Sequence, residues 1–414
     1  MAEREDVLVI GGGAVGVCCA LELARSGRRV RLIERGELCA GCSAGNAGLV
    51  PTSSCAPLAE PGVMGQSLRW MLDPDGAFRF KLRADLRFAR WLWLFRSFCE
   101  AGTWRRNLIY TRDLMRASRA IFEQLSAESD FGFRKKGVLV LYCSEEALQK
   151  GVTAARVLGE MDIRSDLLNR EAVVKREPRA TTEVVGGIHF PEDAHLDPSR
   201  FVNEVGRLAE RAGVHIQTHT DVLALQADGG KVSVVETTSG NFKPELVVLA
   251  AGAWSPQLAG RLRLPLLIEP AKGYSLTLAG AAGNSEIPVR LSTAKTIVTP
   301  MSGSLRLTSK LDLVGLDLDL DERRLDSIPR RVRDYLDLQG DFGKAKPWCG
   351  LRPLTPDGLP IIGRHPSAEN LVLATGHGHL GLALSPITGR LVAQIAAGEH
   401  PSFDIEPMRP DRFE

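Results

Sequence analysis

Residues 6–16, near the start of the chain, decide the fold and read DVLVIGGGAVG. The apolar run Val7–Ile10 leads directly into the pattern Gly11-x-Gly13-x-x-Gly16. The first glycine permits a tight strand-to-helix turn, the second lets a pyrophosphate approach the backbone, and the third lets a helix lie close to the sheet. The free N–H groups at the helix start would then face the diphosphate. This pattern predicts a dinucleotide-binding βαβ unit.

The rest of that unit follows in the expected order. Gly27 ends the helix, and residues 29–33 have the composition of a second strand. Glu34 comes 23 residues after Gly11, where an acid can bind both hydroxyls of a ribose. A GxGxxG pattern alone is weak evidence, but strand, helix stop, second strand and terminal acid together make the dinucleotide interpretation specific.

Composition excludes several classes of function. Of the 414 residues, 52 are Lys or Arg and 50 are Asp or Glu, so the net charge of +2 gives no sign of a nucleic-acid partner. The longest uncharged apolar stretch, Val7–Leu21, is too short to span a bilayer. The acidic residues before it do not suit a signal peptide. We therefore expect a cytoplasmic protein, and the length predicts two or three domains.

The cysteine and acidic motifs do not indicate a metal site. Cys39-x-x-Cys42 could be a redox dithiol or half of a zinc site, but no second CxxC or spaced His pair follows it. The favoured interpretation is a pair of loop cysteines beside a cofactor. Asp317-x-Asp319-x-Asp321 lacks the glycine that an EF-hand loop needs, which favours a strand end followed by a helix start. We expect no metal.

Several segments together resemble the D-amino acid oxidase/dehydrogenase superfamily of FAD enzymes, and bacterial D-amino acid dehydrogenases in particular. The most specific are Gly-Leu-Arg-Pro at Gly350–Pro353 and Thr-Gly-His-Gly at Thr375–Gly378. Ser43–Gly48, Ala250–Trp254 and Lys272–Tyr274 match as well. The resemblance implies an amino acid substrate that loses a hydride from Cα to FAD, and a quinone or dye-type electron acceptor.

Nucleotide-binding patterns alternate with other patterns along the chain, which predicts two interleaved domains. The expected fold class is α/β plus α+β: a Rossmann-like FAD-binding domain with a parallel sheet, and a mixed-sheet substrate-binding domain. The first is expected to comprise residues 1–50, 199–265 and 347–414, and the second residues 51–198 and 266–346. Helices are expected over 322–338 and 386–397.

The resemblance also implies the site residues. Arg352 is expected to hold the substrate carboxylate with its planar fork, and Tyr274 to supply a second polar group. The Gly-rich turn around His379 would present N–H groups to the flavin C2 carbonyl, where negative charge grows on reduction, so it is not read as a metal site. The expected FAD contacts are Gly11, Gly13, Ala14, Val15, Gly16, Glu34, Arg35, Ser43, Asn46, Ala47, Gly48, Leu49, Val222, Ala251, Gly252, Trp254, Gly350, Gly378, His379, Leu380 and Gly381.

FAD is expected to be non-covalent. Similar sarcosine oxidases attach flavin to a cysteine in the segment that matches residues 348–357. Gly350 occupies that position here, and Cys349 lies one residue away.

Several alternatives stay open. One is an oxygen-using amino acid oxidase of the glycine or sarcosine type, and another is a non-catalytic FAD-binding subunit of a larger dehydrogenase. Among dehydrogenases, the run Ser43–Leu49 is closer to those that act on D-proline or cis-4-hydroxy-D-proline, which serve hydroxyproline catabolism. The Trp-, Phe- and Arg-rich residues 66–103 predict either peripheral contact with the inner face of the cell membrane or aromatic packing inside the substrate domain.

Overall fold

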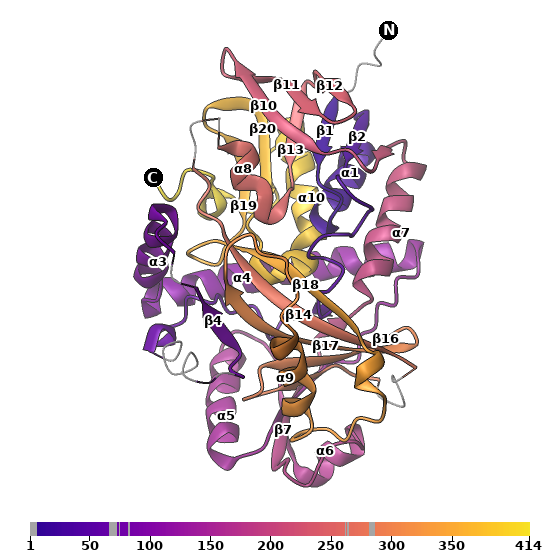
Figure 1. Cartoon of the computed structure of the whole chain (residues 1–414), viewed down its shortest axis with the longest axis vertical. Coiled ribbons are helices and arrows are strands. Elements are labelled where there is room, and N and C mark those ends of the chain that lie inside the picture. The colour runs from indigo at the N-terminus through magenta and orange to yellow at the C-terminus, as the bar shows by residue number, and fades with distance from the viewer. Residues whose placement is uncertain are drawn as a thin grey trace.

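Two large sheets follow one another along the long axis of the molecule (Figure 1). The structure is a computed structural model, and it describes residues 6–65, 73, 75–81, 83–260, 262, 265–280 and 286–414. One sheet is mostly parallel and the other is mixed. Together they confirm the predicted fold class.

The first sheet has six strands in the order β19-β20-β13-β1-β2-β9. β1 is central and runs parallel to β13 on one side and to β2 on the other. All four residues of β1 and of β13 are buried, as expected for strands covered on both faces. The strands are β1 (Val7–Ile10), β2 (Val30–Ile33), β9 (His215–Gln217), β13 (Leu246–Leu249), β19 (Ile361–His365) and β20 (Ala368–Thr375).

Helices α1 (Ala14–Arg25), α7 (Pro198–Arg211) and α10 (Gly381–Ala397) pack beside this sheet, with α1 against both others. A Cβ built on Gly389 of α10 would lie 2.5 Å from the carbonyl oxygen of Cys18. Glycine is therefore what allows α1 and α10 to approach so closely. The continuous helical stretch Gly378–Ala397, which includes α10, is long and apolar enough to cross a bilayer, but most of it is buried inside the protein, the environment of a core helix.

The sequence interpretation started this last helix at Pro386, whereas α10 begins five residues earlier at Gly381. Pro386 lacks the N–H that would bond to the carbonyl of Leu382. The Ser385 hydroxyl donates to that carbonyl at 2.8 Å instead, so the helix passes through the proline.

The mixed sheet has nine strands in the order β18-β14-β17-β16-β15-β5-β7-β6, with β4 pairing beside β17. β18 belongs to this sheet although the expected division put residues 347–414 in the other domain. Its antiparallel pairing with β14 continues from Lys346 to Leu354, so the chain leaves the mixed sheet only after Leu354. The strands are β4 (Phe78–Phe80), β5 (Val138–Tyr142), β6 (Asp166–Asn169), β7 (Gly186–Phe190), β14 (Glu269–Ala279), β15 (Val289–Leu291), β16 (Thr296–Met301), β17 (Ser304–Leu313) and β18 (Lys346–Leu354).

The other elements surround the two sheets. Two small sheets contain β10 (Val222–Asp228), β11 (Lys231–Thr237) and β12 (Gly240–Phe242), and β3 (Leu49–Val50) with β8 (Ala194–His195). The remaining α-helices are α3 (Leu86–Phe98), α4 (Ala101–Glu128), α5 (Glu145–Gly159), α6 (Arg170–Arg176), α8 (Ser255–Ala259) and α9 (Glu322–Val332). Short 3₁₀ turns are η1 (Gly252–Trp254), η2 (Phe342–Lys344), η3 (Gly378–Leu380) and η4 (Glu406–Met408).

α9 explains the acidic run and corrects its expected end. The Asp321 carboxylate accepts a hydrogen bond from the N–H of Arg324, so this aspartate is the N-cap of α9. The helix ends at Val332 rather than at residue 338, because the N–H of Asp337 donates to the carbonyl of Arg179 and Leu336 bridges to Ala180. The described residues contain no cluster that could hold a metal ion.

The aromatic residues of α3 fall into two groups. Phe88 and Trp91 are each 3% exposed, and the indole N–H of Trp91 donates to the carbonyl of Leu354 at 3.0 Å. Leu86 and Trp93 are 90% and 69% exposed. Core packing therefore explains the first pair and not the second. Trp70, in the same stretch, lies outside the described residues.

Candidate active site

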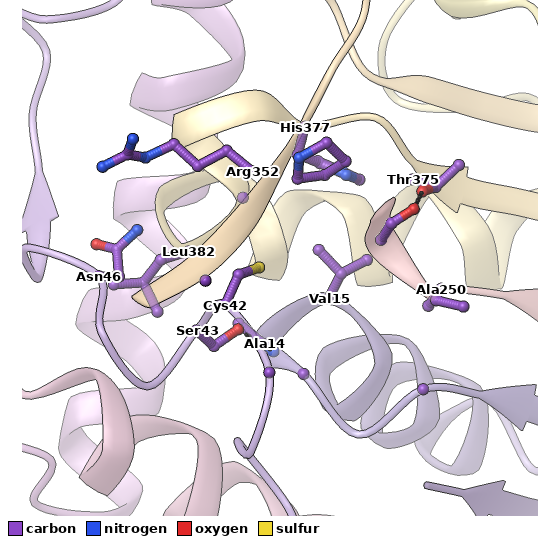
Figure 2. Close-up of a pocket in the computed structure, with 18 of the residues that line it drawn as sticks. Ala14, Val15, Cys42, Ser43, Asn46, Ala250, Arg352, Thr375, His377 and Leu382 are labelled. Carbon is purple, nitrogen blue, oxygen red and sulfur yellow. Dashed lines mark hydrogen bonds between the residues drawn. The ribbon is translucent and has the colours of Figure 1, made fainter. Parts of the chain in front are cut away.

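A cavity of about 620 Å³ lies where the carboxyl ends of the parallel strands meet the mixed sheet. Ile10, Ile33, Ala250 and Thr375 reach it from the ends or just past the ends of β1, β2, β13 and β20. This edge is where open α/β sheets bind ligands. Figure 2 shows Arg352 and Asn46 toward one side of the cavity and Ala250 and Thr375 toward the other.

The start of α1 forms one wall of the cavity. Gly11 has φ +114°, and a Cβ there would lie 2.6 Å from the carbonyl oxygen of Ala250. A Cβ on Gly16 would lie 1.8 Å from the carbonyl oxygen of Gly11, so both glycines are required by close packing. Gly13 differs: it has φ −80°, and its Cβ would meet only the Ser43 hydroxyl at 3.3 Å. The N–H of Ala14 donates to that hydroxyl at 3.1 Å.

Glu34 stands at the end of β2 with its carboxylate fixed. It accepts hydrogen bonds from the N–H groups of Gly12 at 2.6 Å and Gly36 at 3.0 Å. Beside it, the Arg35 guanidinium lies 3.9 Å from the ring centroid of Trp254. Glu34, Arg35 and Trp254 all line the cavity, and so does Val222. This end therefore offers an anionic acceptor and a flat stacking surface.

The loop over residues 43–48 is held from outside by Arg306. Its Nη1 donates to the carbonyls of Ala44 at 2.6 Å and Asn46 at 3.0 Å. Trp348 also packs on this loop, since a Cβ on Gly45 would lie 1.9 Å from its ring. The sequence interpretation assigned no role to Arg306 or Trp348. Trp348 had a signal, because it lies two residues before Gly350 and therefore on the same face of a strand.

Arg352 lies on β18 at the other end of the cavity. Its Nη1 donates to the carbonyl of Lys310 at 2.8 Å. A Cβ on Gly273 would lie 2.4 Å from the guanidinium carbon, so glycine on β14 makes the space that the arginine occupies. Burial lowers the pKa of Arg352. The described residues form no ion pair with it, which leaves its fork available to a carboxylate.

The expectation for Tyr274 is wrong. It is 0% exposed, belongs to the core of the mixed sheet and does not line the cavity. Side chains alternate along a strand, so when Gly273 faces the cavity its neighbour faces the opposite side. Burial raises the pKa of Tyr274, and Asp312 adds to this shift.

The turn before α10 carries two histidines that line the cavity. Burial lowers the pKa of His377 to about 3, and its Nε2 lies 3.0 Å from the Thr388 hydroxyl. Burial, followed by the charges of Arg352 and Arg290, lowers the pKa of His379 to about 4. Both imidazoles are therefore neutral at neutral pH.

His377 gives a prediction for stability. Its folded pKa of about 3 is below the ordinary 6.5, so the stability it contributes is present above pH 6.5 and lost as pH falls toward 3. At pH 5 the loss is about 2 kcal/mol. We expect His377→Gln, which cannot titrate, to lose less stability than the wild type between pH 7 and pH 5, by about that amount. Urea denaturation of the FAD-saturated proteins measures it. Equal losses would contradict a neutral His377.

The cysteines fit the interpretation as loop residues beside a cofactor site. Cys39 is buried and Cys42 lines the cavity, and burial raises the pKa of both thiols. All eight cysteines are free. Cys349 does not line the cavity, and its thiol donates to the carbonyl of Leu318 at 3.0 Å.

Most of the predicted site residues share this one cavity. The exceptions are Tyr274, Gly16 and Gly48; the two glycines serve close packing, since a Cβ on Gly48 would lie 2.2 Å from the carbonyl oxygen of Leu196. The contacts of the others with FAD stay predictions. Those that line the cavity are Gly11, Gly13, Ala14, Val15, Glu34, Arg35, Ser43, Asn46, Ala47, Leu49, Val222, Ala251, Gly252, Trp254, Gly350, Arg352, Gly378, His379, Leu380 and Gly381.

Comparison with known proteins identifies the family. Residues 6–395 match the DAO family, described as FAD dependent oxidoreductase. The chain belongs to this family. FAD fits the residues present, because the open space at Gly13, the fixed carboxylate of Glu34 and the backbone turn at Gly378 all border one cavity. The protein is thus an FAD-dependent oxidoreductase.

Similar proteins cover the whole chain. A D-amino acid dehydrogenase of Neisseria gonorrhoeae (strain NCCP11945) is 31% identical over 416 residues, covering 99% of each sequence. One from Chromohalobacter salexigens is 33% identical over 417 residues, again covering 99% of each. Glycine oxidase from Geobacillus kaustophilus has a TM-score of 0.79 at 25% identity, covering 99% of each chain. L-proline dehydrogenase from P. horikoshii has a TM-score of 0.73 at 21% identity, covering 100% of this chain and 98% of its own, a likeness of fold.

Proposed function

We propose that the protein oxidises a D-amino acid at Cα and passes the electrons to a quinone or dye-type acceptor. The observation that carries the proposal is the position of Arg352. Its guanidinium lies over Gly273 in the same cavity as the start of α1, without an ion-pair partner among the described residues. A planar fork of this kind binds a carboxylate bidentately and so fixes the orientation of an amino acid.

The residues of the chain would contribute orientation and a dry site. When bound, FAD supplies the oxidant that accepts a hydride from Cα. Arg352 would anchor the carboxylate, and neutral His379 adds no further positive charge to the cavity. Two acidic residues line the described cavity, Glu34 and Asp221. Both lie near the end of β2, because the N–H of Thr220, the residue before Asp221, donates to the carbonyl of Glu34. We therefore assign no carboxylate as a base beside Arg352, and we expect the substrate amine to react in its neutral form.

D-Proline and cis-4-hydroxy-D-proline are the substrates favoured within this class. The names of the relatives support a D-amino acid as substrate. The choice of proline derivatives rests on the run Ser43–Leu49, which resembles dehydrogenases that act on them. A panel of D- and L-amino acids with a dye acceptor tests the function. Turnover of D-amino acids supports it. Turnover with oxygen but not with dye would favour an oxidase, and no turnover with any member would favour a non-catalytic FAD-binding subunit.

FAD is expected to be bound non-covalently. Gly350 rather than Cys349 faces the cavity. The Cys349 thiol donates a hydrogen bond to the carbonyl of Leu318 on the other side of the strand. Acid or heat denaturation of the purified protein should release intact FAD into the supernatant. Flavin that stays with the precipitated protein would show a covalent link.

The proposal includes contact between α3 and an anionic membrane surface, where a quinone would be met. Exposed Leu86 and Trp93 lie on the same helix as exposed Arg90 and Arg96, so apolar and cationic groups share its outer side. We expect the holoprotein to co-sediment with anionic liposomes at low salt and less at high salt. Leu86→Ser with Trp93→Ser should weaken this binding. No binding, with fast peroxide formation in air, would contradict both the membrane contact and the acceptor.

A further inference from the structure

Besides Arg352 and Arg35, the cavity is lined by Arg290. It is the middle residue of β15, and its neighbours Val289 and Leu291 are 0% and 2% exposed in the core. Because side chains alternate along a strand, Arg290 faces the cavity. β15 reaches this place by pairing with β5, where Arg290 is opposite Val140.

Most of the hydrogen-bond donors of Arg290 are free in the described part of the chain. A guanidinium has five N–H donors. Arg290 donates one hydrogen bond, from Nη1 to the Ser54 hydroxyl, and forms no ion pair with a described residue. Burial lowers its pKa, and the charge of Asp193 raises it in part. Asp193 is therefore the described carboxylate that could accept from the free N–H groups of Arg290.

Asp193 is already engaged in four hydrogen bonds. Its two oxygens accept hydrogen bonds from the N–H and hydroxyl of Thr52 and from the N–H and hydroxyl of Ser53, at 2.5–3.0 Å. It is 0% exposed, so it cannot turn toward a ligand without breaking this network. Asp193 therefore compensates part of the charge of Arg290 and leaves the guanidinium donors to whatever enters the cavity.

Arg290 and Arg352 both act on the same part of the cavity, since the charges of both lower the pKa of His379. A carboxylate offers about four acceptor positions, fewer than the free donors of two guanidinium groups. If the α-carboxylate binds Arg352, an aliphatic side chain would leave Arg290 desolvated and unpaired. A site built to bond a polar group rejects the analogue that lacks it.

We propose that Arg290 binds an oxygen on the substrate side chain, a carboxylate or a hydroxyl, and selects amino acids that carry one. This subsite rests on the proposed function, in which Arg352 holds the α-carboxylate. A side-chain carboxylate would gain a charge-assisted pair and bind most strongly, a hydroxyl would gain a hydrogen bond, and an aliphatic chain would gain neither. Cis-4-hydroxy-D-proline is then favoured over D-proline.

Selectivity for matched pairs tests the subsite. The pairs are D-glutamate with D-norvaline and cis-4-hydroxy-D-proline with D-proline, each compared by kcat/KM with a dye acceptor. In the wild type we expect the oxygen-bearing member of at least one pair to be favoured by about 10- to 100-fold, the range for a hydrogen bond to a charged group. Arg290→Met should bring that ratio close to one, and Arg290→Lys should give an intermediate ratio.

Ligand binding gives a readout that does not need turnover. Glutarate and pentanoate have the same chain length and cannot be oxidised at an amine-bearing carbon. Titration of each into the holoprotein, followed by the absorbance spectrum of bound FAD, should show tighter binding of glutarate to the wild type. Arg290→Met should lose the preference, and Arg207→Met, which removes an exposed arginine of α7, should keep it.

The outcomes separate the two proposals. Equal binding of glutarate and pentanoate together with wild-type ratios near one would overturn the subsite, as would preferences that survive in Arg290→Met. Suppose that glutarate binds more tightly than pentanoate only when Arg290 is present, and that no amino acid is oxidised. The subsite would then stand, and the proposed function would be refuted. If Arg290→Met fails to hold FAD, Arg290→Lys decides, because it keeps the charge beside Asp193 and loses the fork.

Discussion

Arg352→Ala is expected to lower kcat/KM for the best D-amino acid substrate by about 30- to 5,000-fold while the FAD content stays at the wild-type value. The range corresponds to about 2–5 kcal/mol, the cost of removing one partner of a buried charged pair. The effect is large because Arg352 lines the cavity as a partly buried guanidinium whose desolvation lowers its pKa, and the Lys310 carbonyl already holds one of its donors. Steady-state kinetics with a dye acceptor measure it.

Two further variants separate charge from geometry at this position. Arg352→Lys keeps a cation but loses the planar fork, so its kcat/KM should lie between those of the wild type and Arg352→Ala. Gly273→Ala keeps the arginine, but its Cβ would lie 2.4 Å from the guanidinium carbon and must displace it. We expect it to weaken substrate binding in the same direction.

The control for these variants is Arg333→Ala, because Arg333 is exposed and does not line the cavity. It should leave the kinetics unchanged. Wild-type constants in both Arg352 variants would remove this arginine from the substrate site, whatever the result for Gly273→Ala. Loss of FAD in Arg352→Ala would show instead that the residue supports the cofactor site.

The first βαβ unit could be predicted because its signals are local. Gly11, Gly16 and Glu34 act within one strand-turn-helix-strand, and close packing or N–H donors explain each of them in the structure. The order of the strands was not predicted from the sequence, and the structure supplies it. The apolar runs of β1 and β13 fit strands that are buried on both faces. Local patterning therefore sufficed for the frame of the cofactor site.

The substrate end depends on contacts that the sequence does not show. Tyr274 and Gly273 are adjacent, and only the pairing of β14 with β18 decides that the glycine, and not the tyrosine, faces the cavity. Arg290 had no motif at all, because a three-residue strand pairing with β5 brings it there. The pairing of β14 with β18 likewise places β18 in the mixed sheet, although its position in the chain had suggested the FAD-binding domain. Register between distant strands is the information that was missing.

Gly13→Val is expected to give a folded protein that retains at most about a tenth of the wild-type FAD, since a side chain there occupies the space of the pyrophosphate. The structure makes this substitution a test of the ligand site rather than of the fold. Gly13 has φ −80°, which valine adopts without strain, and its Cβ would meet only the Ser43 hydroxyl at 3.3 Å. Gly16 is the contrast, because its Cβ would lie 1.8 Å from the carbonyl oxygen of Gly11.

Three measurements distinguish the outcomes for Gly13→Val. The ratio of flavin to protein absorbance reports FAD content, circular dichroism reports the fold, and the Tm should equal that of the wild-type apoprotein, because bound FAD stabilises only a chain that can hold it. Gly159→Val, at the end of α5 where a Cβ would meet nothing within 4 Å, should keep FAD. Gly16→Ala should unfold more easily than the wild-type apoprotein. Wild-type FAD content in Gly13→Val would mean that the start of α1 does not bind the pyrophosphate, and the placement of the cofactor along this cavity would have to be abandoned.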